Sequence, residues 1–133
     1  FNKTYLKNIS LIGMPLFARG KNGMAEMMKF LRDGKFIALL IDQHMKRGEP
    51  LQFFGETAFT ATSAAKMALK YNAILMPFFV IRKGRTSNFD LHFEDPIEHS
   101  EPVKMTQEFN DRLEARVKTN PEQWLWTHKR WKG

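Results

Sequence analysis

The chain of 133 residues contains no cysteine, which excludes disulfide scaffolds, thiolate zinc sites and cysteine nucleophiles within it. No stretch reaches the roughly 18 consecutive apolar residues that a membrane-spanning helix needs. The longest apolar runs, 36–41 and 73–81, have the length of strands. The chain opens at Phe1 without an initiator methionine or a signal-peptide pattern, so we expect it to be a fragment of a longer protein.

The composition is apolar enough for one folded domain, with 43% hydrophobic residues, 12 Phe and 3 Trp. Lysine and arginine number 21 against 14 acidic residues, which gives a net charge of +7. Such a surface attracts nucleic acid, anionic lipid headgroups, phosphorylated substrates or an acidic carrier protein. Charge alone does not choose among these partners.

The order of apolar patterns predicts an α/β fold with a mainly parallel sheet and flanking helices, formed as a single domain over 1–133. Helices are predicted over 23–31, from Thr60 or Thr62 to Tyr71, and over 106–118. Strands are predicted over 9–17, 36–41, 73–81 and 89–93. Because a helix separates the continuous apolar runs 36–41 and 73–81, we expect these two strands to be parallel and joined by a right-handed crossover.

Two charged residues are candidates to bind a ligand. Asp42 directly follows the predicted strand 36–41, and ligands of parallel sheets bind beyond the carboxyl ends of the strands. The alternative is an aspartate that caps the following loop. Arg19 lies in the loop before the first helix, where a guanidinium suits a phosphate or a developing oxyanion.

An aromatic segment, Phe53-Phe54-Gly55, precedes Ala58-Phe59-Thr60. Adjacent residues of a strand point to opposite faces, so one of the two phenylalanines is a candidate to line an apolar groove that would take a fatty-acyl chain. A curved loop that buries both rings in the core is the other interpretation.

The C-terminal tail interleaves indoles with basic residues, including Trp126, His128, Arg130 and Trp131. Tryptophan prefers the boundary between water and the membrane interior, and cations pair with anionic headgroups, so the tail is a candidate surface for a membrane or an anionic substrate. RNA, with its bases stacked on the indoles, and packing of the indoles against the sheet are the alternatives.

Histidine and carboxylate spacing provides one false lead. His44 and Glu49 match an H-x4-D/E pattern, in which the histidine acts as general base. With 4 histidines and 14 acidic residues among 133, about 0.4 such pairs are expected by chance. Gly48 in the spacer also favours a flexible turn, so we reject this pair as catalytic. The sequence has no Walker loop, no G-x-S-x-G motif and no metal-ligand cluster.

Several segments together resemble the bacterial lipid A biosynthesis acyltransferases, which transfer lauroyl or myristoyl groups within the lysophospholipid acyltransferase superfamily. The segments are Leu16-Phe17-Ala18-Arg19-Gly20-Lys21, 30–34, Leu40-Ile41-Asp42-Gln43, 53–60, 67–69, Met76-Pro77 and 124–131. They run in the order and spacing of the family from about Leu16 to the end of the chain.

The resemblance implies transfer of a fatty acyl group from acyl carrier protein to a hydroxyl of a Kdo-bearing lipid A precursor. It implies work at the cytoplasmic face of the bacterial inner membrane, with no cofactor, no metal and no nucleic-acid partner. Arg19, Asp42 and the block Phe53–Thr60 would then bind substrate. Acyl carrier protein, the phosphorylated lipid and the anionic membrane would be the acidic partners of the basic surface.

One departure limits what this chain can do. The H-x4-D/E motif of the family lies upstream of the segment that matches Leu16–Gly20, after an N-terminal membrane anchor. We therefore expect the catalytic histidine and its acid upstream of Phe1, and we expect the fragment to be inactive alone. The competing hypothesis is a basic, tryptophan-rich module that binds nucleic acid or a membrane without catalysis.

Overall fold

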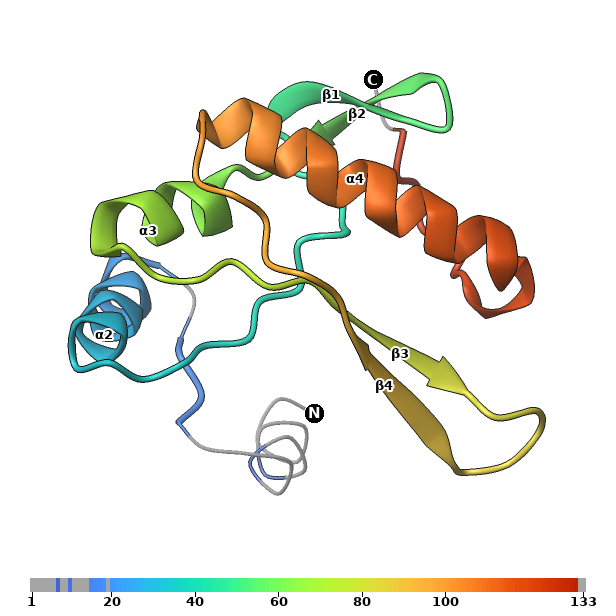
Figure 1. The fold of residues 1–133 in the computed structure, drawn as a ribbon, viewed down its shortest axis with the longest axis horizontal. Helices are drawn as coiled ribbons and strands as arrows, with labels where there is room; N and C mark the ends of the chain where they lie inside the picture. The colour runs from blue at the N-terminus through green and yellow to red at the C-terminus, as the bar shows by residue number, and fades with distance from the viewer. Residues whose placement is uncertain (1–6, 8–9, 11–14, 19, 132–133) are drawn as a thin grey trace. The chain divides into compact units, whose positions relative to one another are not determined.

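A computed structural model describes residues 7, 10, 15–18 and 20–131. The chain divides into two compact units, Phe1–Ala38 and Leu39–Gly133, which are described separately (Figure 1). The described residues form three helices of nine or more residues, two β-hairpins and one short 3-10 helix.

The N-terminal unit contains helix α2 (Lys21–Arg32), which matches the helix predicted over 23–31. Its start requires glycine at position 23, because a Cβ there would lie 1.7 Å from the carbonyl oxygen of Ala18. Its end is closed by Gly34, which has a φ of 71°, and by a hydrogen bond from the Lys35 amide to the Phe30 carbonyl.

The first hairpin joins β1 (Glu49–Phe53) to β2 (Glu56–Thr60), with Leu51 opposite Ala58. Phe54 and Gly55 form its two-residue turn, with φ values of 56° and 75°. Positive φ at both positions is the geometry that matches the twist of a tight hairpin. Glycine adopts it freely, whereas Phe54 adopts it against its intrinsic preference and is held there by the contacts described below.

Helix α4 (Pro102–Thr119) packs against β1 of this hairpin, and helix α3 (Ser63–Tyr71) packs against α4. Helix α3 begins after Thr62, as predicted, and ends at Asn72 in the left-handed conformation. Helix α4 begins four residues before the prediction, because Pro102 fits the first helical turn, where no intrahelical amide bond is lost. The core consists of two clusters: Phe53, Ala58, Phe79, Leu113 and Val117; and Ala65, Ala68, Ile97 and Met105.

The second hairpin joins β3 (Phe78–Arg82) to β4 (Phe89–Phe93), with Val80 opposite Leu91. β4 has the bounds predicted from its alternation, and β3 occupies the C-terminal part of the predicted strand 73–81. The short 3-10 helix η1 (Pro121–Gln123) follows α4 and leads into the tail.

The predicted α/β fold with a mainly parallel sheet is wrong. Both sheets have two strands and both are antiparallel, β1 with β2 and β3 with β4. The predicted strand 36–41 is extended chain without a ladder, and Phe36 and Leu40 are 90% and 83% exposed. Each pair of strands is instead adjacent along the chain, so a short turn suffices where a parallel pair needs a long crossover. The predicted strand 9–17 lies largely outside the described residues, and residues 15–17 form no strand.

Candidate functional site

The tail residues 124–131, which we call the C-terminal clamp, wrap around the first hairpin. The indole nitrogen of Trp131 donates a 2.9 Å hydrogen bond to the Phe53 carbonyl, and its ring stacks on Phe53 with centroids 5.6 Å apart. The ring of Trp124 lies at the same centroid distance from Phe53. Phe53 is fully buried, so these two indoles enclose the strand end from which the turn departs.

Arg130 is the central residue of the clamp, and its side chain is 0% exposed. Its guanidinium donates to the Phe59 carbonyl at 3.1 Å, to Thr60 Oγ1 at 2.6 Å and to Asn110 Oδ1 at 3.4 Å. Asn110 in turn donates from its amide to Thr60 Oγ1 at 3.2 Å. One buried cation therefore links the end of β2, helix α4 and the tail, three segments that are far apart in the sequence.

Asp42 and two histidines complete this polar group. The negative charge of Asp42 raises the pKa of Arg130, although burial of the guanidinium outweighs it and lowers the pKa overall. The backbone N–H of His44 donates to His128 Nε2 at 3.3 Å, and the His44 ring lies against Phe59. We call Asp42, His44, Thr60, Asn110, His128 and Arg130 the Arg130 cluster.

The Arg130 cluster contains four residues that the sequence analysis selected from three segments: Asp42, Thr60, and the tail residues His128 and Arg130. Chemically it holds a fixed positive charge in the interior, because arginine stays protonated even when burial lowers its pKa. The half-buried carboxylate of Asp42 acts on that charge electrostatically, without an ion pair between these two described side chains. The cluster does not supply a nucleophile.

Asn110 is the member that the sequence analysis missed. It is fully buried on α4, on the side that also carries buried Leu113 and Val117. A polar residue on an apolar stripe of a helix is the signal that could have found it, because such a residue needs a buried partner.

The remaining predicted residues have different surroundings. Phe53 is core, while Phe54 is half-buried and packs against Trp126 and Trp131, so the turn at Gly55 holds both rings inside an aromatic group. Trp126 is 53% exposed, and its indole donates to the Pro121 carbonyl at 2.7 Å. Of the four tail residues selected as a surface, Arg130 and Trp131 face the first hairpin. Arg19 lies outside the described residues.

His44 and Glu49 are not joined by a hydrogen bond or ion pair among the described residues, and the buried Nδ1 of His44 has no partner there. Glu49 instead begins β1 opposite Thr60. No group of three or more potential metal ligands occurs in the described part of the chain. Nor does any helix over those same residues combine the length and apolarity needed to cross a bilayer.

Phe54 is held in its positive-φ conformation by Glu114 of α4. The Phe54 amide donates to Glu114 Oε2 at 2.6 Å, and Lys118 both bonds Glu114 and lies 5.5 Å from the centre of the Phe54 ring. The hydrogen bond from Lys118, followed by that from the Phe54 amide, lowers the pKa of the Glu114 carboxyl.

A Glu114→Gln variant is expected to be less stable than wild type by about 1 kcal/mol at neutral pH, because it loses a charge-assisted bond to the turn. A carboxyl whose pKa is lowered on folding stabilises the folded protein at pH values above its pKa in the unfolded chain. That stabilisation is lost as the pH falls through the pKa of the carboxyl in the folded protein. Urea unfolding from neutral pH down to about pH 3 should therefore show the two proteins converging below about pH 5. A constant difference across this range would contradict the role of the Glu114 charge.

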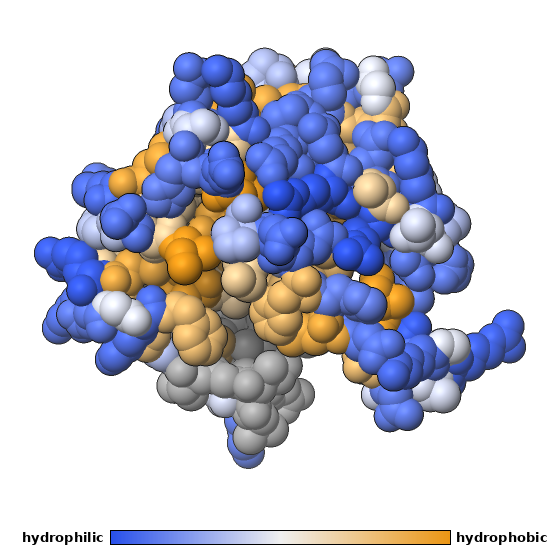
Figure 2. Space-filling model, viewed as in Figure 1, coloured by the Kyte–Doolittle hydropathy of each residue, from blue (hydrophilic) through white to orange (hydrophobic). Residues whose placement is uncertain are grey.

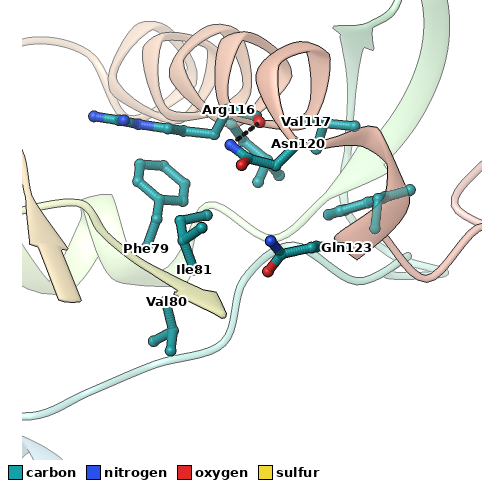
Figure 3. A pocket seen from close by; sticks show the side chains of 9 residues that line it. Phe79, Val80, Ile81, Arg116, Val117, Asn120 and Gln123 are labelled. Atoms are coloured by element: carbon teal, nitrogen blue, oxygen red, sulfur yellow. Dashed lines mark hydrogen bonds between the residues drawn. The ribbon is translucent and has the colours of Figure 1, made fainter. Parts of the chain in front are cut away.

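A shallow groove of about 160 Å³ lies elsewhere, between β3, α4 and η1 (Figure 3). Its lining is mainly apolar, with Arg116 as the one cation among the described residues that line it. The apolar lining residues are Phe79, Val80, Ile81, Leu113, Val117 and Trp124. None of the residues selected from the sequence lines it, so the groove is separate from the Arg130 cluster.

Comparison with protein families gives a match over residues 12–133 to the model described as bacterial lipid A biosynthesis acyltransferase. The match covers the Arg130 cluster, both hairpins and the clamp. A search of curated proteins gives no match.

Proposed function

This chain belongs to the bacterial lipid A biosynthesis acyltransferase family, and from that premise we propose that its parent protein transfers a fatty acyl group from acyl carrier protein to a hydroxyl of a Kdo-bearing lipid A precursor. The family assignment makes the protein a transferase that acts on a lipid A-type substrate. The acyl donor, the acceptor hydroxyl and the late place of the reaction in lipid A assembly are the parts that we propose.

The observation that carries the proposal is the match over 12–133, which contains every segment of the resemblance. The Arg130 cluster supports it, because the Arg130 guanidinium binds Thr60 Oγ1 and lies within the electrostatic influence of Asp42, although the three residues come from separate segments. In this proposal Asp42 positions the acceptor, and the clamp keeps the hairpin 49–60 in place beside it. The catalytic histidine and its acid come from sequence upstream of Phe1, and residues 1–133 alone are inactive.

The net charge of +7 supports acidic partners for this protein. Acyl carrier protein, a phosphorylated glucosamine lipid and an anionic bilayer all fit such a surface. The family is associated with the bacterial inner membrane, and we place the reaction at its cytoplasmic face.

The test is an acyl-transfer assay with the parent protein, acyl carrier protein charged with a lauroyl or myristoyl group, and a Kdo-bearing lipid A precursor. We expect a product heavier than the acceptor by one acyl group, and no product from residues 1–133 alone. A parent protein that forms no product with either chain length, but binds RNA in a salt-dependent way, would overturn the proposal in favour of a nucleic-acid-binding module.

A further inference from the structure

One face of the second hairpin is apolar and open to solvent. Residues paired across an antiparallel ladder share a face, so Val80 lies beside Leu91, and Phe93 and Phe89 lie on the same side. Their exposures are 52%, 53%, 63% and 50% in that order. We call Val80, Phe89, Leu91 and Phe93 the hairpin apolar face. Four half-exposed large apolar side chains on one short hairpin form a contiguous patch, which marks an interaction surface more often than scattered single residues do.

The opposite face of the hairpin is anchored to the rest of its unit. Figure 3 shows Phe79 and Ile81 pointing toward α4 while Val80 points away from it. Phe79 stacks on Phe109 of α4 with centroids 6.3 Å apart, and the Arg82 amide donates to Gln123 Oε1 at 2.8 Å. The hairpin apolar face is therefore turned outward by contacts on the other side.

The turn end of the same hairpin is basic. Arg82, Lys83 and Arg85 lie at or beside the turn, against a single carboxylate within 78–93, Asp90. Asp90 pairs with Lys83 at 2.7 Å and sits opposite Ile81, on the side away from the hairpin apolar face. Arg82 lies over the Phe89 ring at 4.7 Å, so its cation borders the apolar patch directly. In Figure 2 the turn end of the second hairpin is hydrophilic, and apolar residues appear toward the other end of the hairpin.

An apolar patch bordered by cations matches the surface of an anionic bilayer, where apolar side chains enter the headgroup boundary and cations pair with phosphates. Val80 and Leu91, at the centre of the patch, are aliphatic, which favours contact with acyl chains over stacking of nucleobases. We propose that the hairpin apolar face, with Arg82, Lys83 and Arg85, docks the protein on anionic lipid. The inference rests on the proposed function, since it supplies the surface that would hold the site at its lipid substrate.

Residues 1–133 contain no cysteine, so a cysteine introduced into this stretch is a unique labelling site once any cysteine upstream of Phe1 in the parent protein has been replaced by serine. An environment-sensitive fluorophore on Leu91→Cys should shift its emission to the blue with phosphatidylglycerol vesicles, and less with phosphatidylcholine vesicles. The same fluorophore on Ala115→Cys, an exposed position of α4, is the matched control and should not shift. Equal shifts at both positions, or none at position 91, would overturn the proposal.

Two further results would also overturn it. A blue-shifted label at position 91 without vesicles, together with a dimer in sedimentation, would mean that a second copy covers the face. Equal shifts with both lipids would remove the role of the cations. Because the labels report binding rather than acyl transfer, a negative result here with an active parent protein rejects the docking face alone. A positive result with an inactive parent protein rejects the proposed chemistry alone.

The cations are tested by a charge-removing pair, Arg82→Gln with Arg85→Gln, on the labelled background. Each basic residue near an anionic surface contributes about fivefold to binding, so the pair should weaken vesicle affinity about 30-fold. Lys66→Gln with Lys104→Gln, two exposed positions on other helices, removes the same charge elsewhere and should change the affinity much less. Equal losses from both pairs would reduce the effect to net charge and contradict a defined docking face.

Discussion

Replacing Arg130 with alanine is expected to lower the free energy of unfolding by about 3 kcal/mol. The guanidinium is fully buried, and its loss leaves the Phe59 carbonyl, Thr60 Oγ1 and Asn110 Oδ1 without their donor. It also leaves a cavity beside Phe53, whose ring centre is 5.5 Å from the guanidinium carbon. Urea unfolding followed by fluorescence of the tryptophans of the clamp measures the effect.

Lys129→Ala is the matched control, because the neighbouring side chain is exposed and its removal should change stability by less than about 0.5 kcal/mol. Arg130→Lys keeps the charge but has one ammonium in place of a planar fork, so it should fall between wild type and the alanine variant. If the alanine variant does not fold, the free energy of unfolding of the lysine variant tests the role of Arg130 instead. An alanine variant within about 0.5 kcal/mol of wild type would contradict the central place of Arg130 in the clamp.

The helices could be predicted because their signals are local. The apolar periodicities over 23–31 and 106–118, and the helix predicted from Thr60 or Thr62 to Tyr71, belong to the segments that fold into α2, α4 and α3. β4 likewise has the bounds indicated by its alternation. These features depend on neighbours within a few residues, and a sequence displays them directly.

The pairing of strands could not be predicted in the same way. The run 36–41 is apolar along its whole length, which is compatible with a buried strand, but apolarity says nothing about which segment would supply the hydrogen bonds of a ladder. The missed hairpin 49–60 did carry a signal. Phe54-Gly55 separates two short segments with buried apolar residues, Leu51 and Phe53 before it and Ala58 after it, and glycine at the second turn position favours a tight turn.

Several residues of the candidate site could be predicted from the sequence, but their contacts could not. Asp42, Thr60, His128 and Arg130 were selectable one by one, from position, residue type and resemblance. That the guanidinium of Arg130 is buried against Thr60 and Asn110 depends on the packing of the clamp against β2 and α4. The composition of the tail did not predict the burial of Arg130, because a basic and aromatic segment suits a membrane surface and a buried cation–aromatic core equally well.

The sequence did not predict the hairpin apolar face either, because its residues are of types that are usually buried. Val80, Leu91 and Phe93 are the residue types expected in a core, and the alternation in 89–93 does not tell which face of the strand is covered. Only the pairing of β3 with β4, and the contacts of Phe79 with α4, assign these side chains to the open side.

The rate of acyl transfer by the parent protein with Asp42→Asn tests most directly whether the Arg130 cluster belongs to the acyltransferase site. Asparagine keeps the size of the side chain and removes the negative charge that acts on Arg130, so the fold should persist while the positioning of the acceptor is lost. We predict a fall in transfer of about 100-fold, the scale on which a misplaced substrate or a lost electrostatic contact acts. Asp95→Asn, an exposed carboxylate whose side chain makes no hydrogen bond or ion pair with the described residues, should retain the wild-type rate. An Asp42→Asn protein that is as stable as wild type and transfers acyl groups at the wild-type rate would contradict the assignment of this cluster to the acyltransferase site.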